Sequence, residues 1–314
     1  MTGSDRTDGA SSGDDTGRGA PDHFALLADE TRLETLRVLA DERRENWRPS
    51  GLRFAELRRA VGVDDAGTFN YHLEKLVGTY VYEDDGTYVL TNSGLEIVDA
   101  VLAGRYGGDD RRLTGEIDDV CPTCGGSLTA IHERGWIRVV CDEHGIVLGT
   151  TLPSGAAVGR EIDAVVDIAV RDLLNDTEWG MRGVCFRCWG AMDREVQFGT
   201  PDRHPATGES LDAAQRVADP DEPVAVFGCS RCETVFWGSV TAALLRAEPV
   251  VAFATDHGVE RESVRALFET GTVTVERRDP PRLAVSFDAP EGDATLRVTV
   301  DRGLSTTAVE RTDE

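Results

Sequence analysis

The sequence is nearly devoid of lysine: of its 33 basic residues, only Lys75 is not an arginine. It also lacks any apolar run of the roughly 18 residues that a helix needs to cross a bilayer, which argues against a membrane-spanning protein. Residues 1–20 contain no apolar stretch of the kind found in signal peptides, so we expect a cytoplasmic location. The net charge of −24 makes positive charge scarce, which argues against simple electrostatic capture of nucleic acid.

The chain is long and apolar enough for two or three globular domains, since it has 314 residues of which 40% are hydrophobic. Its seven cysteines are an odd number, and six of them form three Cys-x-x-Cys pairs. Without a secretion signal, this pattern favours metal thiolates over structural disulfides. We divide the chain into a disordered acidic tail (1–21), a first domain (22–104), a linker (105–115), a cysteine-rich region (116–258) and a β-rich segment (259–314).

The first domain begins with helical periodicity. A short helix is expected over residues 23–29, and Thr31 can cap a second helix. A third helix spans Phe54–Val61 after an arginine-containing loop, and Gly62 stops it. The inward face of the second helix consists of Leu33, Leu36, Leu39 and Ala40.

A fourth helix, capped by Asp64 or Asp65, runs to about Val77. Two strands follow, Tyr80–Tyr82 and Thr87–Leu90, and an Asp-Gly turn joins them. A last helix starts at about Ser93. The outward face of the fourth helix consists of Thr68, Asn70, Tyr71 and Lys75, and its inward face of Phe69, Leu73, Leu76 and Val77. This order of elements is that of a winged helix-turn-helix, whose recognition helix lies in the major groove of DNA.

The charge of this domain is a poor match to DNA, because residues 22–104 hold nine basic and sixteen acidic side chains. Arginine is nevertheless concentrated over 43–59, beside the turn that leads to the recognition helix. We therefore expect contacts to phosphates from Arg53, Arg58 and Arg59, unless these side chains pair with surface carboxylates. On the recognition helix, Asn70 suits an adenine edge, while Thr68 and Tyr71 suit phosphates or thymine methyls and Lys75 also faces outward.

The cysteine-rich region contains an internal duplication. Val120-Cys121-Pro-Thr-Cys124-Gly-Gly126 recurs 64 residues later as Val184-Cys185-Phe-Arg-Cys188-Trp-Gly190. The second halves, Cys141-Asp-Glu-His144 and Cys229-Ser-Arg-Cys232, also match, and each runs on into an apolar strand ending in glycine.

This spacing predicts two structural zinc ribbons, because four Cys or His ligands close a tetrahedral site. The first site consists of Cys121, Cys124, Cys141 and His144, and the second of Cys185, Cys188, Cys229 and Cys232. The repeat aligns His144 with Cys232, which favours His144 over His132 as the fourth ligand. Redox dithiols are a rival interpretation, but the strand-flanking knuckles do not offer the helix N-terminus that usually lowers a thiol pKa.

Two resemblances follow from these residues. The run Ala25–Ala40 and the segment Phe69-Asn-Tyr-His-Leu-Glu-Lys-Leu76 are similar to ArsR-type winged-helix regulators. The acidic, lysine-poor composition resembles proteins of salt-loving archaea, and the whole arrangement resembles ArsR-like regulators of halophilic archaea with a zinc-ribbon C-terminal region. At molar salt the Debye length is about 3 Å, so distant acidic groups barely repel phosphates. Residues 22–104 lack cysteine, so heavy-metal sensing in that domain is not supported.

The resemblance implies transcriptional control by an α+β protein: a winged helix-turn-helix, a duplicated zinc-ribbon region and a small C-terminal antiparallel sheet. We expect binding of double-stranded DNA as a homodimer through the helix that carries Val98, Val101 and Leu102. One alternative is a general transcription factor resembling archaeal initiation factor E alpha, which would bind RNA polymerase. Another is a zinc-ribbon scaffold for protein interactions. We expect no enzyme, since no Ser-His-Asp set, phosphate loop or open metal site is evident.

Overall fold

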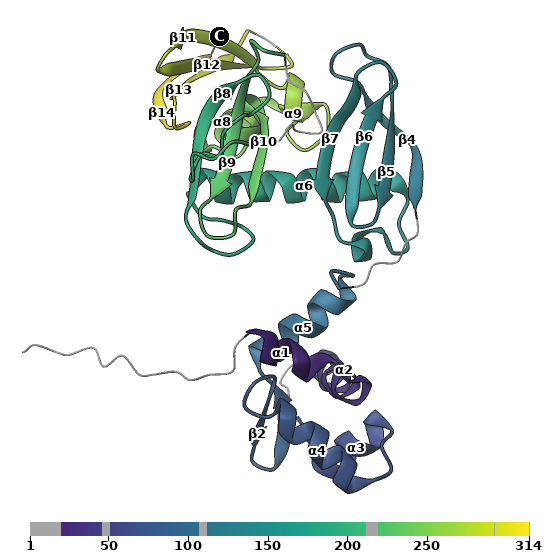
Figure 1. Ribbon diagram of the computed structural model, residues 1–314. Coiled ribbons are helices and arrows are strands. Elements are labelled where there is room, and N and C mark those ends of the chain that lie inside the picture. Colours follow the sequence, from purple (N-terminus) through teal and green to yellow (C-terminus); the bar gives the residue numbers. More distant parts are fainter. Residues whose placement is uncertain (1–19, 46–50, 107–111, 212–218, 292, 314) are drawn as a thin grey trace, which may run out of the picture. The chain divides into compact units, whose positions relative to one another are not determined.

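The structure, a computed structural model, describes residues 20–45, 51–106, 112–211, 219–291 and 293–313. The chain forms two compact units, the first ending at Leu102 and the second starting at Ala103 (Figure 1). Both units mix helices with antiparallel sheets, so the α+β class is confirmed. Within the described ranges, no helix has the length and apolar character needed to cross a bilayer.

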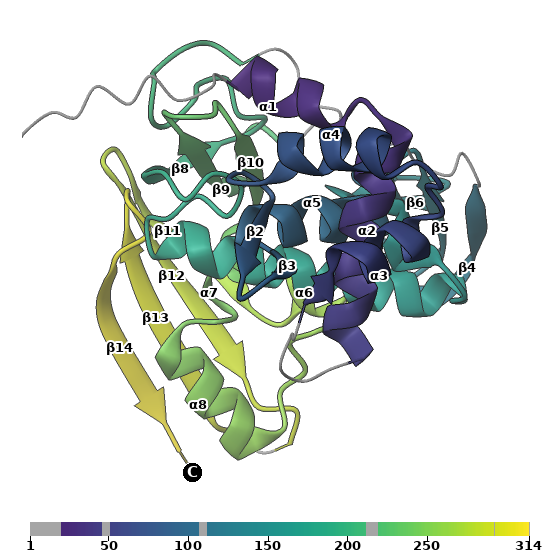
Figure 2. The same cartoon turned by 90° about the horizontal axis from the view of Figure 1, so that it is seen from below.

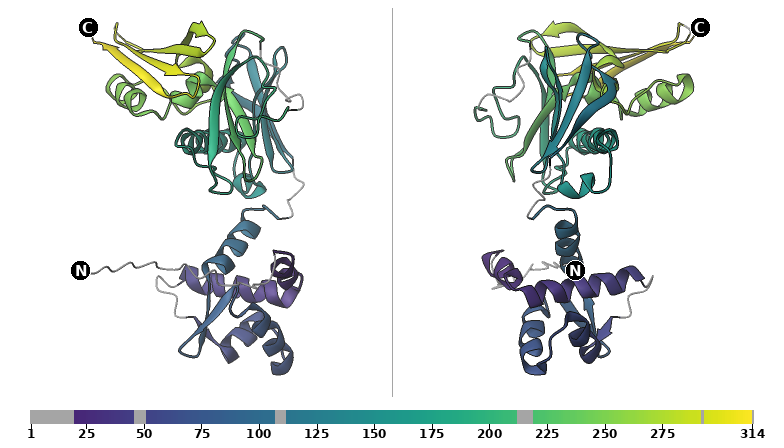
Figure 3. Two further views of the ribbon diagram at one scale, coloured as in Figure 1. Left: turned by 60° about the vertical axis from the view of Figure 1, so that its left-hand side comes forward. Right: turned by 90° about the vertical axis from the view of Figure 1, so that its right-hand side faces the viewer.

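The N-terminal unit places its helices around a small three-stranded sheet of order β1-β3-β2. Its elements are α1 (Ala20–Leu27), α2 (Glu30–Glu45), β1 (Leu52–Arg53), α3 (Phe54–Val61), α4 (Ala66–Leu76), β2 (Val81–Asp84), β3 (Thr87–Leu90) and α5 (Asn92–Leu102). Helix α2 packs against α3, α4 and α5 (Figure 3). The helices and the hairpin agree with the predicted order; β1 was missed, because a two-residue strand has no periodicity.

The core of this unit forms where the apolar faces of its helices meet. Leu36 of α2, Leu57 of α3 and Phe69 of α4 are fully buried. Phe54 contacts Phe69 edge-to-face at 5.3 Å between ring centroids. Asp65 caps α4, since its carboxylate accepts a hydrogen bond from the Thr68 amide at 2.7 Å.

Two details of α2 differ from the prediction. Leu33 is 40% exposed and lies outside the core, because the helix turns this position away from α3 and α4. Asp29, not Thr31, supplies the cap: its carboxylate accepts from the Arg32 amide at 3.1 Å. The expected acidic tail also ends early, because Ala20 and Pro21 already belong to α1; residues 1–19 lie outside the described residues.

The C-terminal unit starts with two antiparallel sheets that share one connecting helix. The first sheet contains β4 (Leu113–Val120), β5 (Ser127–Glu133), β6 (Trp136–Cys141) and β7 (Gly145–Thr151) in sequence order. A 3-10 turn, η1 (Ser154–Ala157), leads to α6 (Ile162–Met181). The second sheet contains β8 (Met192–Phe198), β9 (Pro223–Cys229) and β10 (Val235–Ser239), in the order β10-β9-β8.

Helix α6 runs across one face of both sheets (Figures 1 and 3). Its buried stripe contains Val165, Val166, Ala169 and Leu174. The strands β5, β6 and β7 have the same meander as β8, β9 and β10, each preceded and interrupted by cysteine loops. The topology therefore repeats in the same places as the sequence.

The rest of the unit consists of short helices and a third sheet. These elements are α7 (Val240–Leu244), α8 (Glu248–His257), α9 (Ala266–Glu269), β11 (Thr272–Arg278), β12 (Pro281–Asp288), β13 (Thr295–Asp301) and β14 (Thr306–Thr312). Helix α8 lies beside the sheet β11–β14 (Figure 2), where Arg311 of β14 pairs with Asp256 at 2.8 Å. The C-terminal antiparallel sheet is thus confirmed.

Two predicted boundaries are wrong. The segment 259–314 is no separate part, because one continuous core extends from Ile117 to Leu304 and includes side chains of β12 and β13. The linker 105–115 also ends early, since β4 begins at Leu113 through pairing with His132; residues 107–111 lie outside the described residues.

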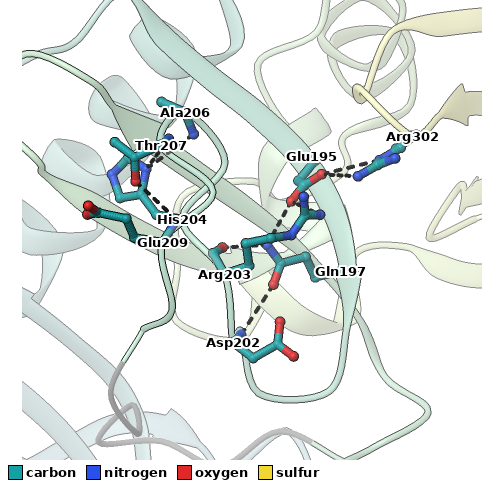
Figure 4. Close-up of polar contacts among 9 residues, drawn as sticks. All are labelled: Glu195, Gln197, Asp202, Arg203, His204, Ala206, Thr207, Glu209 and Arg302. Carbon is teal, nitrogen blue, oxygen red and sulfur yellow. Dashed lines mark hydrogen bonds and ion pairs between the residues drawn. The ribbon is translucent and has the colours of Figure 1, made fainter.

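A buried carboxylate ties the third sheet to the second. Glu195 of β8 accepts hydrogen bonds from Arg203 and from Arg302, each at 2.7 Å, and Gln197 adds another at 2.9 Å (Figure 4). Nearby, His204 Nδ1 accepts from the amides of Ala206 and Thr207 (Figure 4). These contacts fix the 199–211 loop and the β13–β14 turn against β8.

Candidate functional site

Each predicted metal site is built from two loops that the sheets bring together. In the first site, the Cys121 amide donates to Gly126 O and the Gly125 amide donates to Cys121 O, both at 2.8 Å. Gly125 adopts a left-handed φ of 70°, which its missing Cβ permits. The turn after β6 then places Cys141 and His144 opposite this knuckle.

The second site repeats this backbone pattern with different residues. The Cys185 amide donates to Gly190 O and the Trp189 amide donates to Cys185 O, again at 2.8 Å. The left-handed residue here is Trp189, with φ of 60°, in the place that Gly125 occupies in the first site. Such a conformation is unfavourable for a bulky side chain, so the rest of the knuckle must enforce it.

The geometry of both groups fits a tetrahedral metal ion. The four donor atoms of each group lie within 4.8 Å of one another. Cys185 and Cys232 Sγ are 3.7 Å apart, and Cys188 and Cys229 Sγ are 3.6 Å apart. A tetrahedron with metal–sulfur bonds of about 2.3 Å has edges of about 3.8 Å, whereas a disulfide requires about 2.0 Å.

The first site has matching distances around its imidazole. His144 Nδ1 lies 3.7 Å from Cys121 Sγ and 3.7 Å from Cys141 Sγ, and Cys124 Sγ is 3.7 Å from Cys141 Sγ. His132 is not part of this group: it is buried, and its Nε2 lies 2.9 Å from the Leu152 carbonyl oxygen. The structure therefore brings together the eight side chains that the repeat predicted, as two sets that could hold metal ions.

Electrostatics in the second site show why a cation would be favourable. The Thr234 hydroxyl, 3.1 Å from Cys232 Sγ, is the main cause that lowers the pKa of Cys232 to about 6, against the opposing effect of burial. For Cys188, the Gly190 amide favours the thiolate, but burial and the neighbouring thiols outweigh it and raise the pKa to about 12. Without a cation, the cluster cannot hold all of its sulfurs as thiolates.

The first site behaves in the same way. Burial raises the pKa of Cys121, but the amides of Cys124 and Thr123 and the adjacent thiols outweigh it and lower the pKa to about 6. The Gly126 amide favours the Cys124 thiolate, yet burial and the other thiols raise its pKa to about 11. A low-pKa thiol therefore does exist in each site, but three further donors surround it instead of the single partner of a redox dithiol.

Residues around the second site that sequence spacing did not reveal hold its loops in place. Arg231 donates through its guanidinium to Cys188 O at 3.2 Å and through its amide to Cys229 Sγ at 3.4 Å. Thr234 contacts Cys232 as described. In the sequence, Arg231 and Thr234 stand out only because they lie close to a metal-ligand cysteine. Other residues of the same loop share that property, so the sequence could not single these two out.

The residues predicted to contact nucleic acid lie on α4, on α3 and at the end of β1. Thr68, Asn70 and Tyr71 are exposed, and Lys75 is half-buried with its ammonium 5.4 Å from the Tyr71 ring centroid. The Asn70 amide donates to the Glu74 carboxylate at 2.7 Å. The four predicted side chains thus share one outward face of α4, opposite the buried Phe69, Leu73 and Leu76.

The arginines of this region have different roles. Arg53 and Arg59 are exposed. Arg58 is turned inward: its guanidinium donates to Val63 O at 2.8 Å and to Asp64 O, which fixes the turn between α3 and α4. Both bonds come from one guanidinium nitrogen, Nη1, so the phosphate contact expected from Arg58 stays a prediction.

Of the three α5 residues expected at a dimer interface, one is buried and two are exposed. Val98 is buried in the N-terminal unit's own core, so it cannot contribute to an interface as predicted. Val101 and Leu102, at the end of α5, are 49% and 53% exposed. His72 of α4 is half-buried, with Nδ1 3.2 Å from an Asp29 carboxylate oxygen.

Comparison with known families gives two matches. Residues 118–306, more than half of the chain, match a family described as a domain of unknown function (DUF7351). Residues 20–101 match a second domain of unknown function (DUF7347). These limits correspond closely to the two compact units. No curated protein matches the chain. No solved structure matches it either.

Proposed function

The chain belongs to the DUF7351 family, and we propose that it is a DNA-binding transcription regulator, similar to ArsR-like regulators of halophilic archaea, whose C-terminal unit is stabilised by two zinc ions. In this proposal the N-terminal unit is a winged helix-turn-helix and the C-terminal unit a duplicated zinc ribbon. The observation that carries the DNA-binding role is α4, which presents Asn70, Tyr71 and Lys75 on one face while its other face is anchored in the core.

The surroundings of α4 support the same role. Arg58 fixes the tight turn from α3 to α4, as a helix-turn-helix requires. The hairpin β2–β3 follows α4 in the position of a wing, although its tip carries Glu83, Asp84 and Asp85 and would be repelled by a minor groove. To recognise an adenine, the Asn70 amide would have to release the Glu74 carboxylate and bind the edge of the base instead.

Zinc is the ion that fits the two clusters. A set of four cysteines and a set of three cysteines with one histidine, both at tetrahedral spacing, are typical of structural zinc, whereas calcium and magnesium prefer oxygen ligands. Four protein ligands would leave no open position for a substrate or catalytic water. Dimerisation is proposed through the exposed Val101 and Leu102, with Val98 confined to the core.

The test is selection of genomic DNA fragments by the purified full-length protein in molar KCl, followed by sequencing. We expect a short palindrome to be enriched, and Asn70→Ala/Tyr71→Ala to lower its affinity at least about tenfold, because each base contact contributes roughly 1–3 kcal/mol. The matched control is Asn92→Ala/Tyr106→Ala, which removes the same residue types from exposed positions outside α4.

Two outcomes would contradict this proposal. Enrichment of no sequence would favour an interaction scaffold, and recovery of RNA polymerase subunits in a pull-down would then favour the general transcription factor. An equal loss of affinity in both double variants would show that α4 does not read the DNA. Metal analysis of the same preparation, with an expected two zinc ions per chain, tests the ribbon assignment separately.

A further inference from the structure

The C-terminal unit contains a cleft that neither metal site uses. Its volume is about 430 Å³, and it lies between β7 of the first sheet and β10 of the second, over α6. In the described part of the unit, β7 pairs only with β6 and β10 only with β9, so the two strands are sheet edges that face one another (Figure 1). The volume falls within the ~300–1,000 Å³ of typical small-molecule sites.

The walls of the cleft are mainly apolar and rich in aromatic rings. The lining side chains that matter for the argument are Trp136, Leu148, Phe186, Phe236 and Trp237. Phe186 and Phe236 meet edge-to-face, with ring centroids 5.4 Å apart, and Phe236 also stacks on Phe227 at 4.5 Å, so these rings are held in place. Aromatic walls of this kind bind apolar bodies and also attract cations through the ring quadrupole.

One carboxyl group lies among these apolar side chains. Asp176 projects from α6, and burial raises its pKa to about 7. The negative charge of Asp172 also raises this pKa. The positive charges of Arg187 and Arg105 lower the pKa of Asp176, but their effect is smaller than that of burial and Asp172 together. Arg187, the other charged residue of the lining, is exposed and donates to the Thr151 hydroxyl at 3.0 Å. The inner charged group of the cleft is therefore an acid that lacks a full counter-charge.

We propose that this cleft binds a small organic cation, an ammonium group carried on an aromatic or hydrophobic body. The ammonium would pair with the Asp176 carboxylate, and the body would pack against Trp136, Phe236 and Trp237. An anion would meet the Asp176 carboxylate of the lining, whereas a neutral molecule would bury that carboxylate further without supplying a positive charge. This proposal goes beyond DNA binding and does not depend on it.

The position of the cleft gives the ligand a structural role as well. β7 follows the loop of Cys141 and His144, and β10 follows the loop of Cys229 and Cys232. A molecule between the two strands would therefore contact both halves of the duplication at equivalent places. The site exists only when both repeats are folded in one unit.

Three probes with the same body test the charge preference: phenethylamine, phenethyl alcohol and phenylacetate. Binding to the full-length, metal-loaded protein is measured by calorimetry, and quenching of tryptophan emission reports on Trp136 and Trp237. At about pH 8.5 we expect phenethylamine to bind at least about tenfold more tightly than the alcohol, with phenylacetate weakest. At about pH 5.5 the preference should largely vanish, because Asp176 is then protonated.

Asp176→Asn should abolish the preference for the amine while leaving binding of the alcohol unchanged, which also shows that the cleft is intact. Asp167→Asn, an exposed carboxylate on the same helix, is the matched control and should behave like the unaltered protein. The proposal is overturned if no probe binds at millimolar concentration, if phenylacetate binds as well as the amine, or if Asp176→Asn keeps the amine preference.

Discussion

The two units of this protein maintain their folds by different means. The N-terminal unit closes a small core with side chains from α2, α3 and α4, and its described residues include no cysteine. The C-terminal unit has a larger core, but its two cysteine clusters join loops far apart in the chain, such as those of Cys185 and Cys232. The first unit can therefore fold by burial of apolar surface alone, whereas the second, in our proposal, is also stabilised by metal ions bound at its two clusters.

Removal of the metal ions is expected to produce the largest difference in stability between the two units. A strong chelator should unfold the C-terminal unit, since structural zinc contributes on the order of 10 kcal/mol to such folds. The helices of the N-terminal unit should persist. Four of the five tryptophans belong to the C-terminal unit, so their emission should change while much of the helical circular dichroism remains.

Single-ligand variants extend this test to each site. Cys141→Ser and Cys229→Ser should each lower the bound metal from two ions to one, because the two clusters share no ligand. His144→Cys should retain both ions, since it converts the first site to the ligand set of the second. Loss of both ions from either serine variant would show that the sites are coupled, and simultaneous unfolding of both units by chelator would refute the comparison.

A core substitution should destabilise the N-terminal unit and leave the stability of the C-terminal unit unchanged. Phe69→Ala removes a fully buried ring from the N-terminal unit and is expected to cost about 3–5 kcal/mol. Since the stability of a small unit is only about 5–15 kcal/mol, its unfolding transition should move to much lower denaturant while that of the C-terminal unit stays in place. Urea titration followed by both circular dichroism and tryptophan emission measures this.

The control for this variant is Leu33→Ala on the same unit. Leu33 is 40% exposed, so the change should cost less than about 1 kcal/mol. A similar cost for both substitutions would mean that the apolar face of α2 is assigned wrongly.

The sequence predicted those features that repeat locally. Helical periodicity located α3 and α4, the Asp-Gly turn located the hairpin β2–β3, and the duplicated cysteine spacing predicted which eight side chains come together. Periodicity could not separate Val98 from Val101, because both lie on the apolar side of α5 and only the packing of neighbouring helices decides which one is covered.

Features that depend on the orientation of backbone groups, or on segments far apart in the chain, were not predictable. The inward turn of Arg58 requires the carbonyl groups of Val63 and Asp64, whose orientation no spacing reveals. The cleft combines residues from Trp136 to Phe268, and Asp176 looks like any other acidic position of α6 in the sequence. The left-handed Trp189 follows from the knuckle's hydrogen bonds, in a place where composition alone favours the adjacent glycine.

The smallest effect compares one ion-pair substitution in each unit. Glu195→Gln in the C-terminal unit keeps the shape of a buried side chain but weakens its contacts with Arg203 and Arg302, so we expect a loss of about 1–2 kcal/mol. Glu34→Gln in the N-terminal unit disrupts the more exposed pair with Arg37 and should cost less than about 0.5 kcal/mol. The same urea titrations measure both. Equal costs would mean that the buried carboxylate contributes no more than a surface one, and that apolar packing and the backbone bond from the Val196 amide to Arg302 O attach the third sheet to β8.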